Sequence, residues 1–279
     1  METKSQKRLI MSAKYVVLSV LLLLFFLPLI SMVSVSLKAE SEIFMKTGKL
    51  FPEKLHFENY FNAATRIDYL RFVYNSLIVA VMYTVTCTLS SAMAGYALAR
   101  FHIKENNLFF TIVLSSIMIP YVITLIPFYL LVKNMGLTDK HVLWLIYGLG
   151  GAPFMIYLYK QFFSTIPQSF EESARIDGAR RFQIFFQIMM PLVKSGTIIT
   201  AIFAFQFTWQ NYIMPALFLS SLKTTLAVKI NGAYVDIQQN ILLGELMAGV
   251  IYYIGIPVLL FFVFQKYIMR GMLEGGVKG

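Results

Sequence analysis

Six long apolar segments, separated by shorter polar ones, take up most of this sequence. Each has about 20 or more mostly apolar residues, and a helix rising ~1.5 Å per residue needs about that many to cross a hydrocarbon layer ~30 Å thick. The sequence therefore predicts an all-α, polytopic membrane protein with about six transmembrane helices. We expect these helices at residues 15–37, 72–99, 108–132, 142–163, 192–220 and 246–264.

The composition excludes most other classes of protein. The chain is 58% hydrophobic and only 14% charged, whereas a soluble globular domain typically carries about 25% charged residues. The net charge of +10 suits a protein beside anionic lipid headgroups. Because the basic residues lie between apolar segments instead of along one stripe, we expect no nucleic-acid binding. The single cysteine, Cys87, allows no internal disulfide and has no metal-ligand spacing, so we expect no metal site.

The distribution of charge predicts an orientation. If the N-terminus is cytoplasmic, the cytoplasmic segments hold 14 basic and 6 acidic residues, and the external segments hold 10 and 8. Cytoplasmic loops carry an excess of Lys and Arg, so we expect both termini in the cytoplasm. We divide the chain into residues 1–71, with the first helix and an external loop, and residues 72–279, a membrane core with a cytoplasmic loop at 164–191 and a cytoplasmic tail.

The cytoplasmic loop at 164–191 is unusually apolar. Its pattern predicts two helices joined at Gly178, with Asp177 as a candidate cap of the second helix. The second helix has an aromatic face that includes Phe182, Phe185 and Phe186. This face either packs under the membrane helices or docks in the groove of a partner protein.

Within this loop the spacing of Glu172, Gly178, Ile188 and Pro191 resembles the EAA motif of ATP-binding-cassette (ABC) importer permeases. The one departure is Ser173, where the family has the middle alanine, and serine is also small. The residues that match the motif and its surroundings are Glu172, Ser173, Ala174, Asp177, Gly178, Ala179, Ile188 and Pro191.

Two further segments resemble permeases for carbohydrates. Trp209, Asn211 and Tyr212, followed by Pro215, are similar to a Trp-Asn-aromatic-x-x-Pro region of that family, although Gln210 interrupts the pattern. The chain end, with Gly275, Gly276 and Lys278, is similar to that of the six-helix permease subunit of maltose transporters, whose tail reaches the ATPases.

The resemblance implies a type I ABC-importer permease fold in a bacterial cytoplasmic (inner) membrane. It implies a heterodimer with a second permease, two ATP-binding subunits beneath it, and an extracytoplasmic solute-binding protein that delivers a sugar, by family membership an oligosaccharide. The loop at 164–191 would carry the coupling helix, with Glu172 contacting a basic residue of the ATPase and Gly178 allowing a turn that a Cβ could obstruct. The chain itself would be no enzyme and bind no cofactor, because ATP and Mg²⁺ belong to the ATPase subunits.

The fifth apolar segment holds the candidate substrate residues. Sugars are bound by aromatic faces and by amide and hydroxyl groups, and polar side chains at membrane depth usually have a function or a polar partner. Hydrogen bonding between helices is the alternative explanation. The candidates are Gln206, Trp209, Gln210, Asn211 and Tyr212.

The sequence lacks the features that two other classes of membrane protein, secondary transporters and membrane-embedded enzymes, would need. An ABC-importer permease for another polar solute remains an alternative, because the sequence does not identify the substrate. An ion-coupled secondary transporter usually has acidic or basic residues at membrane depth, and none of the predicted helices has an acid in its core. A membrane-embedded enzyme would need a catalytic motif, and GxSxG and HExxH are both absent.

Overall fold

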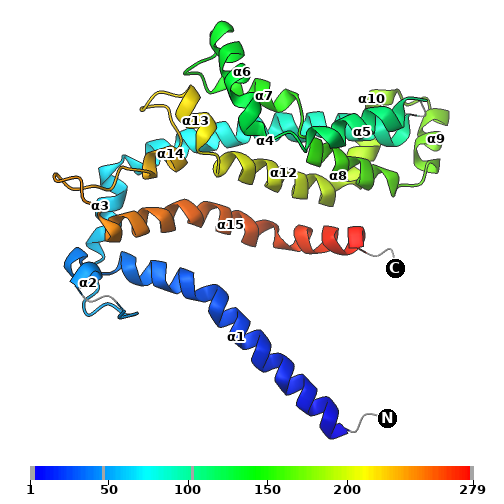
Figure 1. Cartoon of the computed structure of the whole chain (residues 1–279). Coiled ribbons are helices and arrows are strands. Elements are labelled where there is room, and N and C mark those ends of the chain that lie inside the picture. The colour runs from blue at the N-terminus through cyan, green and yellow to red at the C-terminus, as the bar shows by residue number, and fades with distance from the viewer. Residues whose placement is uncertain (1–3, 46–47, 102–103, 277–279) are drawn as a thin grey trace. The chain divides into compact units, whose positions relative to one another are not determined.

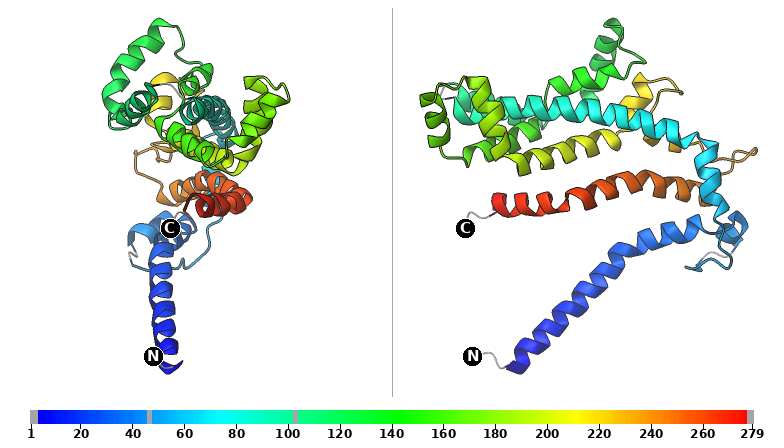
Figure 2. Two further views of the ribbon diagram at one scale, coloured as in Figure 1. Left: turned by 90° about the vertical axis from the view of Figure 1, so that its right-hand side faces the viewer. Right: turned by 180° about the vertical axis from the view of Figure 1, so that it is seen from behind.

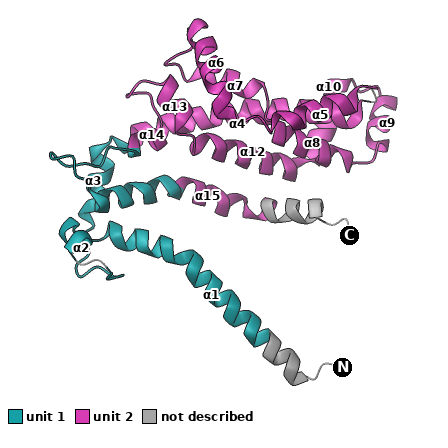
Figure 3. Cartoon of the chain, in the orientation of Figure 1, with its two compact units in different colours: residues 1–69, 230–255 teal, residues 70–229, 256–279 magenta. Residues whose placement is uncertain are grey.

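The computed structural model describes residues 4–45, 48–101 and 104–276, with side chains described from 11 to 267 outside the two gaps. Helices make up nearly all of this part, in which the sole β-type pairing is an isolated bridge between Val235 and Ile241. The all-α prediction is therefore confirmed. The chain forms two compact units: residues 1–69 with 230–255, and residues 70–229 with 256–279 (Figure 3). The division at residue 71 stays a prediction.

Figure 1 labels the helices in chain order, apart from η1 and α11. Their bounds are α1 Lys4–Ser36, α2 Glu40–Met45, α3 Glu58–Arg66, α4 Tyr69–Arg100, α5 Asn106–Ser116, α6 Tyr121–Asn134, α7 Val142–Leu149, α8 Pro153–Ser164, α9 Ser169–Ile176, α10 Arg181–Gln183, the π-helix η1 Ile184–Met189, α11 Met190–Leu192, α12 Lys194–Trp209, α13 Ile213–Phe218, α14 Leu226–Ile230 and α15 Leu243–Gly276.

Three helices of the described chain are long and apolar enough to cross a membrane by themselves, at Met11–Ser36, Tyr69–Arg100 and Leu243–Tyr267. Three further candidates are pairs of helices bent at short breaks: α5 with α6 by 94°, α7 with α8 by 52°, and the 181–192 segment with α12 by 85°. The number of spans among the described residues reaches six if each pair counts as one, which agrees with the predicted number.

Proline and glycine explain the breaks in the first two pairs. Pro120 precedes α6 with an extended backbone, and a proline disfavours helical geometry in the residue before it. Gly151 has a φ of +68°, which glycine adopts at little cost, and Pro153 then occupies the first turn of α8, where its missing N–H is tolerated. By contrast, Pro127 and Pro257 lie inside α6 and α15.

The prediction of one continuous helix over 192–220 is wrong. Helix α12 ends at Trp209, and a separate helix, α13, begins at Ile213. Pro215 has no N–H to donate to the carbonyl of Asn211, so an α-helix cannot continue through this point without losing a hydrogen bond. Instead, Asn211 Oδ1 accepts a hydrogen bond from the backbone N of Met214 at 3.0 Å, a local bond that competes with helix continuation.

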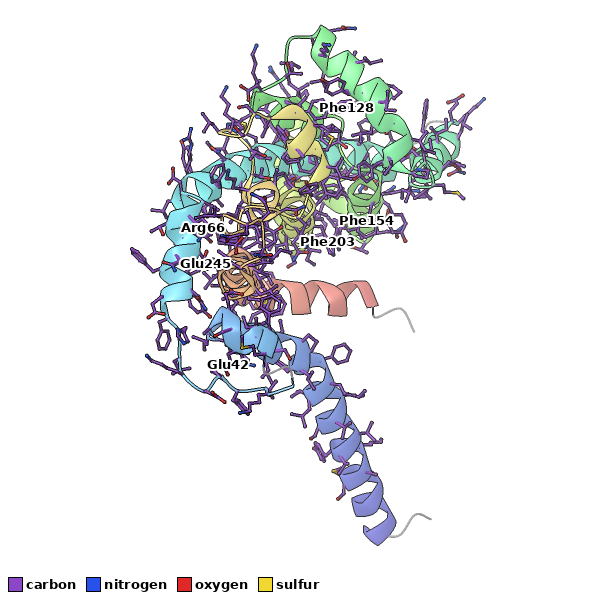
Figure 4. The ribbon with its side chains drawn as sticks, turned by 60° about the vertical axis from the view of Figure 1, so that its left-hand side comes forward. Glu42, Arg66, Phe128, Phe154, Phe203 and Glu245 are labelled. Carbon is purple, nitrogen blue, oxygen red and sulfur yellow. The ribbon has the colours of Figure 1, made fainter. Side chains whose placement is uncertain are left out.

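In the first unit, charged side chains join α3 to the start of α15. Arg66 donates to both carboxylate oxygens of Glu245, at 2.5 and 3.2 Å (Figure 4), and this bond raises the pKa of Arg66. The carboxylate of Glu40 accepts from the backbone N of Leu243 and Gly244 at 3.1 and 2.7 Å. A carboxylate at the first turn of a helix is favourable, because the N–H groups there lack partners within the helix.

In the second unit, α4, α8 and α12 pack closely. The hydroxyl groups of Thr200 and Tyr159 are 2.9 Å apart in a buried hydrogen bond, and the rings of Phe154 and Phe203 meet edge to face with centroids 5.9 Å apart. Figure 4 labels this aromatic pair. Small residues permit the approach: a Cβ added to Gly95 would lie 2.5 Å from the Cβ of Tyr159 and 2.9 Å from the carbonyl oxygen of Ile156.

One polar contact joins the loops after α6 and α13 in the same unit. Asp139 Oδ1 accepts from the backbone N of Ser220 at 2.9 Å, and Asp139 Oδ2 accepts from Lys223 Nζ at 3.0 Å. The bond from Ser220, followed by that from Lys223, lowers the pKa of Asp139 to about 2. The two loops therefore lie at the same end of this unit, and the right-hand view of Figure 2 shows α9 and the segment after it at its other end.

We expect Gly95→Ala to destabilise the second unit. The added methyl must displace α8 backbone, and overpacking of this kind typically costs ~1–3 kcal/mol. Gly255→Ala is the matched control, since a Cβ there meets no heavy atom within 4 Å, and alanine favours a helix over glycine by up to ~1 kcal/mol. Thermal unfolding of both variants in detergent checks this, and equal midpoints would contradict the close packing.

Candidate functional site: the coupling loop

The first half of the predicted motif forms the short helix α9 and its C-terminal cap. The backbone N of Ala179 donates to the carbonyl of Ala174 at 2.9 Å, and that of Gly178 donates to Arg175 at 3.1 Å. Together with a φ of +81° at Gly178, these bonds form a Schellman motif, in which a left-handed residue closes the helix. The small side chains of Ala174 and Ala179 meet in one apolar cluster, as this motif commonly requires.

The structure changes the reason for glycine at position 178. We expected a Cβ to obstruct the turn, but a Cβ built there meets no heavy atom within 4 Å. The constraint comes instead from the left-handed backbone, which costs an L-residue roughly 1–2 kcal/mol. The prediction that Asp177 caps the second helix is also wrong, because Asp177 is the C-cap residue of α9. The second helix begins after Arg180, whose backbone N donates to Gln183 Oε1 at 2.8 Å.

In the second half of the loop, part of the aromatic face packs under the membrane helices and part stays exposed, so both predicted roles remain open for it. Ile184, Phe185 and Met189 are buried in a cluster with residues of α4, α8 and α9. Phe182 and Phe186 remain 69% and 47% exposed. The aromatic face is therefore divided between packing under the membrane helices and an accessible surface.

The structure brings most of the motif residues together. A hollow of about 400 Å³ opens between α9 and η1, and Phe170 is among the residues that line it. Glu172, Gly178 and Pro191 are exposed. The hollow is lined by the motif residues Ser173, Ala174, Asp177, Ala179 and Ile188.

Sequence reasoning missed the residue that fixes this loop, Glu171. Its side chain is 6% exposed, and its Oε1 lies 3.0 Å from Arg100 Nε, as an ion pair without a hydrogen bond between these atoms. Tyr96 donates its hydroxyl to Glu171 Oε2 at 3.2 Å, and Arg175 approaches the same oxygen at 3.6 Å. A sequence signal existed: Glu171 lies three residues before Ala174, on the apolar face of α9, whereas Glu172 lies off that face.

The candidate substrate residues lie around the end of α12. Trp209 is 2% exposed and stacks on Phe205 with ring centroids 5.5 Å apart. Gln206 and Asn211 are half-buried, whereas Gln210 and Tyr212 are exposed. The candidates therefore do not share one helix face: Gln210 lies in the turn after α12, and Asn211 caps the turn before α13.

The C-terminal candidates lie partly outside the structure's description. Helix α15 continues through Gly275 and Gly276, and Lys278 lies outside the described residues. Among the described residues there is no group of three His, Cys, Asp or Glu side chains that could hold a metal ion.

Comparison with known proteins agrees with this geometry. Residues 87–274 match the family model described as "Binding-protein-dependent transport system inner membrane component". The chain is 31% identical to the melibiose/raffinose/stachyose import permease protein MelC of Bacillus subtilis, over 91% of this chain and 92% of MelC. It is 30% identical to the arabinooligosaccharides transport system permease protein AraQ of the same organism, over 92% of each.

Two further comparisons extend over nearly the whole chain. The lactose transport system permease protein LacG of Rhizobium radiobacter is 29% identical over the full length of both chains. The crystal structure of a bacterial ABC transporter involved in alginate import contains a chain with the same fold, with a TM-score of 0.78, 24% identity and coverage of 96% and 99%. This chain therefore belongs to the family of inner-membrane components of binding-protein-dependent transport systems, as an ABC-importer permease.

Proposed function

We propose that this chain is one of two similar permease subunits of an ABC importer that moves an oligosaccharide into the cytoplasm. An extracytoplasmic solute-binding protein delivers the sugar, and two ATPase subunits, which hold ATP and Mg²⁺, drive its passage. The chain binds no cofactor of its own. The observation that carries the proposal is the coupling loop, in which Glu172 and a motif-lined hollow face outward while Glu171 and Ala174 are buried against the membrane helices.

The outward face of the loop has the features of a docking surface for the ATPase. Glu172 offers a carboxylate to a basic side chain of the ATPase. When such an ion pair is buried in an interface, removing one partner weakens binding strongly, because the other charge is left unpaired. Two residues before Glu172, Phe170 is 47% exposed and lines the hollow. Exposed aromatic residues next to a pocket are typical anchors of protein interfaces.

Its relatives support a sugar as the substrate. MelC is named for melibiose, raffinose and stachyose, AraQ for arabino-oligosaccharides and LacG for lactose, so the shared chemistry is a chain of two or more sugar units. In this chain, Gln206, Gln210 and Tyr212 retain accessible polar surface at the end of α12. Amide and hydroxyl groups in this position suit the hydroxyl groups of a sugar, and the second permease subunit supplies the remaining contacts.

We also propose that both termini lie in the cytoplasm, in the cytoplasmic membrane of a bacterium. Two contacts within the second unit support this topology. Asp139 and Lys223 join two of the loops that the charge bias places outside, and Arg100 and Glu171 join two of the segments that it places inside. The segments placed inside have a larger excess of basic over acidic residues than the loops placed outside, as cytoplasmic segments usually do.

We expect cells that produce this chain with its neighbouring transport genes to accumulate radiolabelled raffinose, arabinotriose or lactose, and to lose that uptake when this gene is deleted. Because ATP drives the proposed importer, a protonophore should leave uptake largely intact in cells whose ATP level is maintained. Uptake of histidine alone, or uptake abolished by the protonophore at normal ATP, would contradict the proposal.

For the substrate pathway, we expect Gln210→Ala to raise the sugar concentration for half-maximal uptake by up to about tenfold, the equivalent of one hydrogen bond. Trp209→Ala serves as the contrast: its buried ring fills the core, so its loss, typically ~3–5 kcal/mol, should lower the amount of folded protein instead. An unchanged half-maximal concentration for Gln210→Ala would remove this residue from the pathway.

At the turn of the coupling loop, we expect Gly178→Val to reduce sugar transported per ATP hydrolysed, because a β-branched residue strains the left-handed backbone. Gly178→Asn is the matched control, since asparagine occupies that region far more readily. Transport and ATP hydrolysis by reconstituted complexes measure the ratio. Equal ratios for the two variants would show that the backbone conformation at 178 does not matter for coupling.

A further inference from the structure

Two adjacent glutamates of α9 have opposite environments. Glu172 is exposed, whereas the Glu171 side chain is 6% exposed and paired with an Arg100 side chain that is 5% exposed. An ionised carboxylate is rarely buried unless it is paired, so Glu171 is held in one place by its partners. The outward carboxylate serves the proposed docking of the ATPase, and the inward one has no role in it.

Arg100 joins α4 both to the segment before α9 and to the first turn of α9. It is the last residue of α4, where a positive charge is favourable because the helix carbonyls there lack partners. Its Nη2 donates to the carbonyl oxygen of Ile166 at 2.6 Å, before α9 begins, and its Nε lies 3.0 Å from Glu171 within α9. Tyr96, one turn earlier on α4, donates to the same carboxylate.

Helix α4 leads from this ion pair to the region of the substrate candidates. Tyr83 lies 17 residues before Arg100 on α4, or ~25 Å along a helix. Its ring is tilted against that of Phe207 with centroids 5.6 Å apart, and Phe207 lies on α12, three residues before Gln210 in the following turn. The ion pair and α12 are thus joined through one continuous helix.

We propose that the Arg100–Glu171 ion pair makes α9 and the cytoplasmic end of α4 move as one body, so that displacement of α9 by the ATPases reaches α12 through α4. Glu171 and Arg100 are positioning residues that act through α4. The inference rests on the proposed function and deepens it. A buried ion pair holds one geometry because any sliding leaves a charge unpaired, whereas apolar packing such as that of Ala174 is not directional.

The test is a distance measurement in the purified complex of this chain with its co-produced partners. Spin labels at Met93→Cys and Ile176→Cys, which replace exposed side chains of α4 and α9, are placed in a Cys87→Ser background as the only labelled cysteines. Pulsed dipolar spectroscopy then compares the nucleotide-free complex with the complex trapped by ATP and vanadate. We expect the distance to stay within ~2 Å, the usual scale of small helix shifts.

Glu171→Gln should break this rigidity. In that variant we expect the trapped complex to show a shifted or at least twofold broader distance distribution, while the ATPase subunits still co-purify in wild-type amounts. Glu172→Gln, the matched control at the next position, should keep the wild-type distance and instead retain less ATPase. A third variant, Glu171→Asp, keeps the charge and should restore a narrow distribution, a rescue that loss of folding alone would not give.

The outcomes separate this inference from the proposed function. A wild-type complex in which the label distance changes by more than ~2 Å on trapping, or a Glu171→Gln complex with an unchanged distribution, overturns the rigid link and leaves the importer function standing. Failure of the wild-type chain to co-purify with any ATPase overturns the proposed function. Loss of ATPase from Glu171→Gln to the same extent as from Glu172→Gln also overturns the link, because Glu171 would then serve docking.

Discussion

The hydrocarbon layer offers no hydrogen-bond partner to a peptide group, and the rest of this structure depends on that constraint. Backbone that faces lipid has to be helical, so a break needs protein around it or a side chain that replaces the lost bond. The break after α12 meets this requirement, because Asn211 accepts from Met214. Gly151 lies against Ser91, whose Oγ accepts a hydrogen bond from the backbone N of Ala152 at 3.0 Å.

Because the hydrocarbon layer disfavours charged groups, ion pairs that join one helix to another lie mostly at the ends of the helices. Removing one partner of a buried ion pair typically costs ~3–5 kcal/mol, so Arg100 and Glu171 fix the position of α9 more firmly than Ala174 and Ile184 would do by packing alone. The left-handed turn at Gly178 then directs the chain from α9 back to α10 and η1. One face of α9 therefore packs against the membrane unit, and the opposite face stays free for the proposed docking of the ATPase, as a coupling element would need.

Much of the fold followed from local sequence patterns, and what was missed depended on specific contacts that hydropathy does not register. Hydropathy predicted helices at α1, α4 and α15, and the motif spacing predicted the helix–turn–helix around Gly178. The break after Trp209 was missed because hydropathy registers neither the missing N–H of Pro215 nor the hydrogen bond that Met214 donates to Asn211. Glu171 was missed because its importance arises from Arg100, 71 residues earlier in the chain. Trp209 was a candidate sugar-binding residue because aromatic faces stack on sugars, and only the packing of the structure shows that its ring is buried.

We propose that the exposed face of α9 meets the ATPase in the cytoplasm, whereas the charge distribution predicts that the loop at 231–242 is external. A photo-reactive p-benzoylphenylalanine residue at position 172, and another at position 237 where Ile237 is 95% exposed, tests both parts in intact membranes. We expect an adduct between position 172 and an ATPase subunit, and none with an ATPase from position 237. An ATPase adduct from position 237, or none from position 172 in an assembled complex, would overturn the proposal.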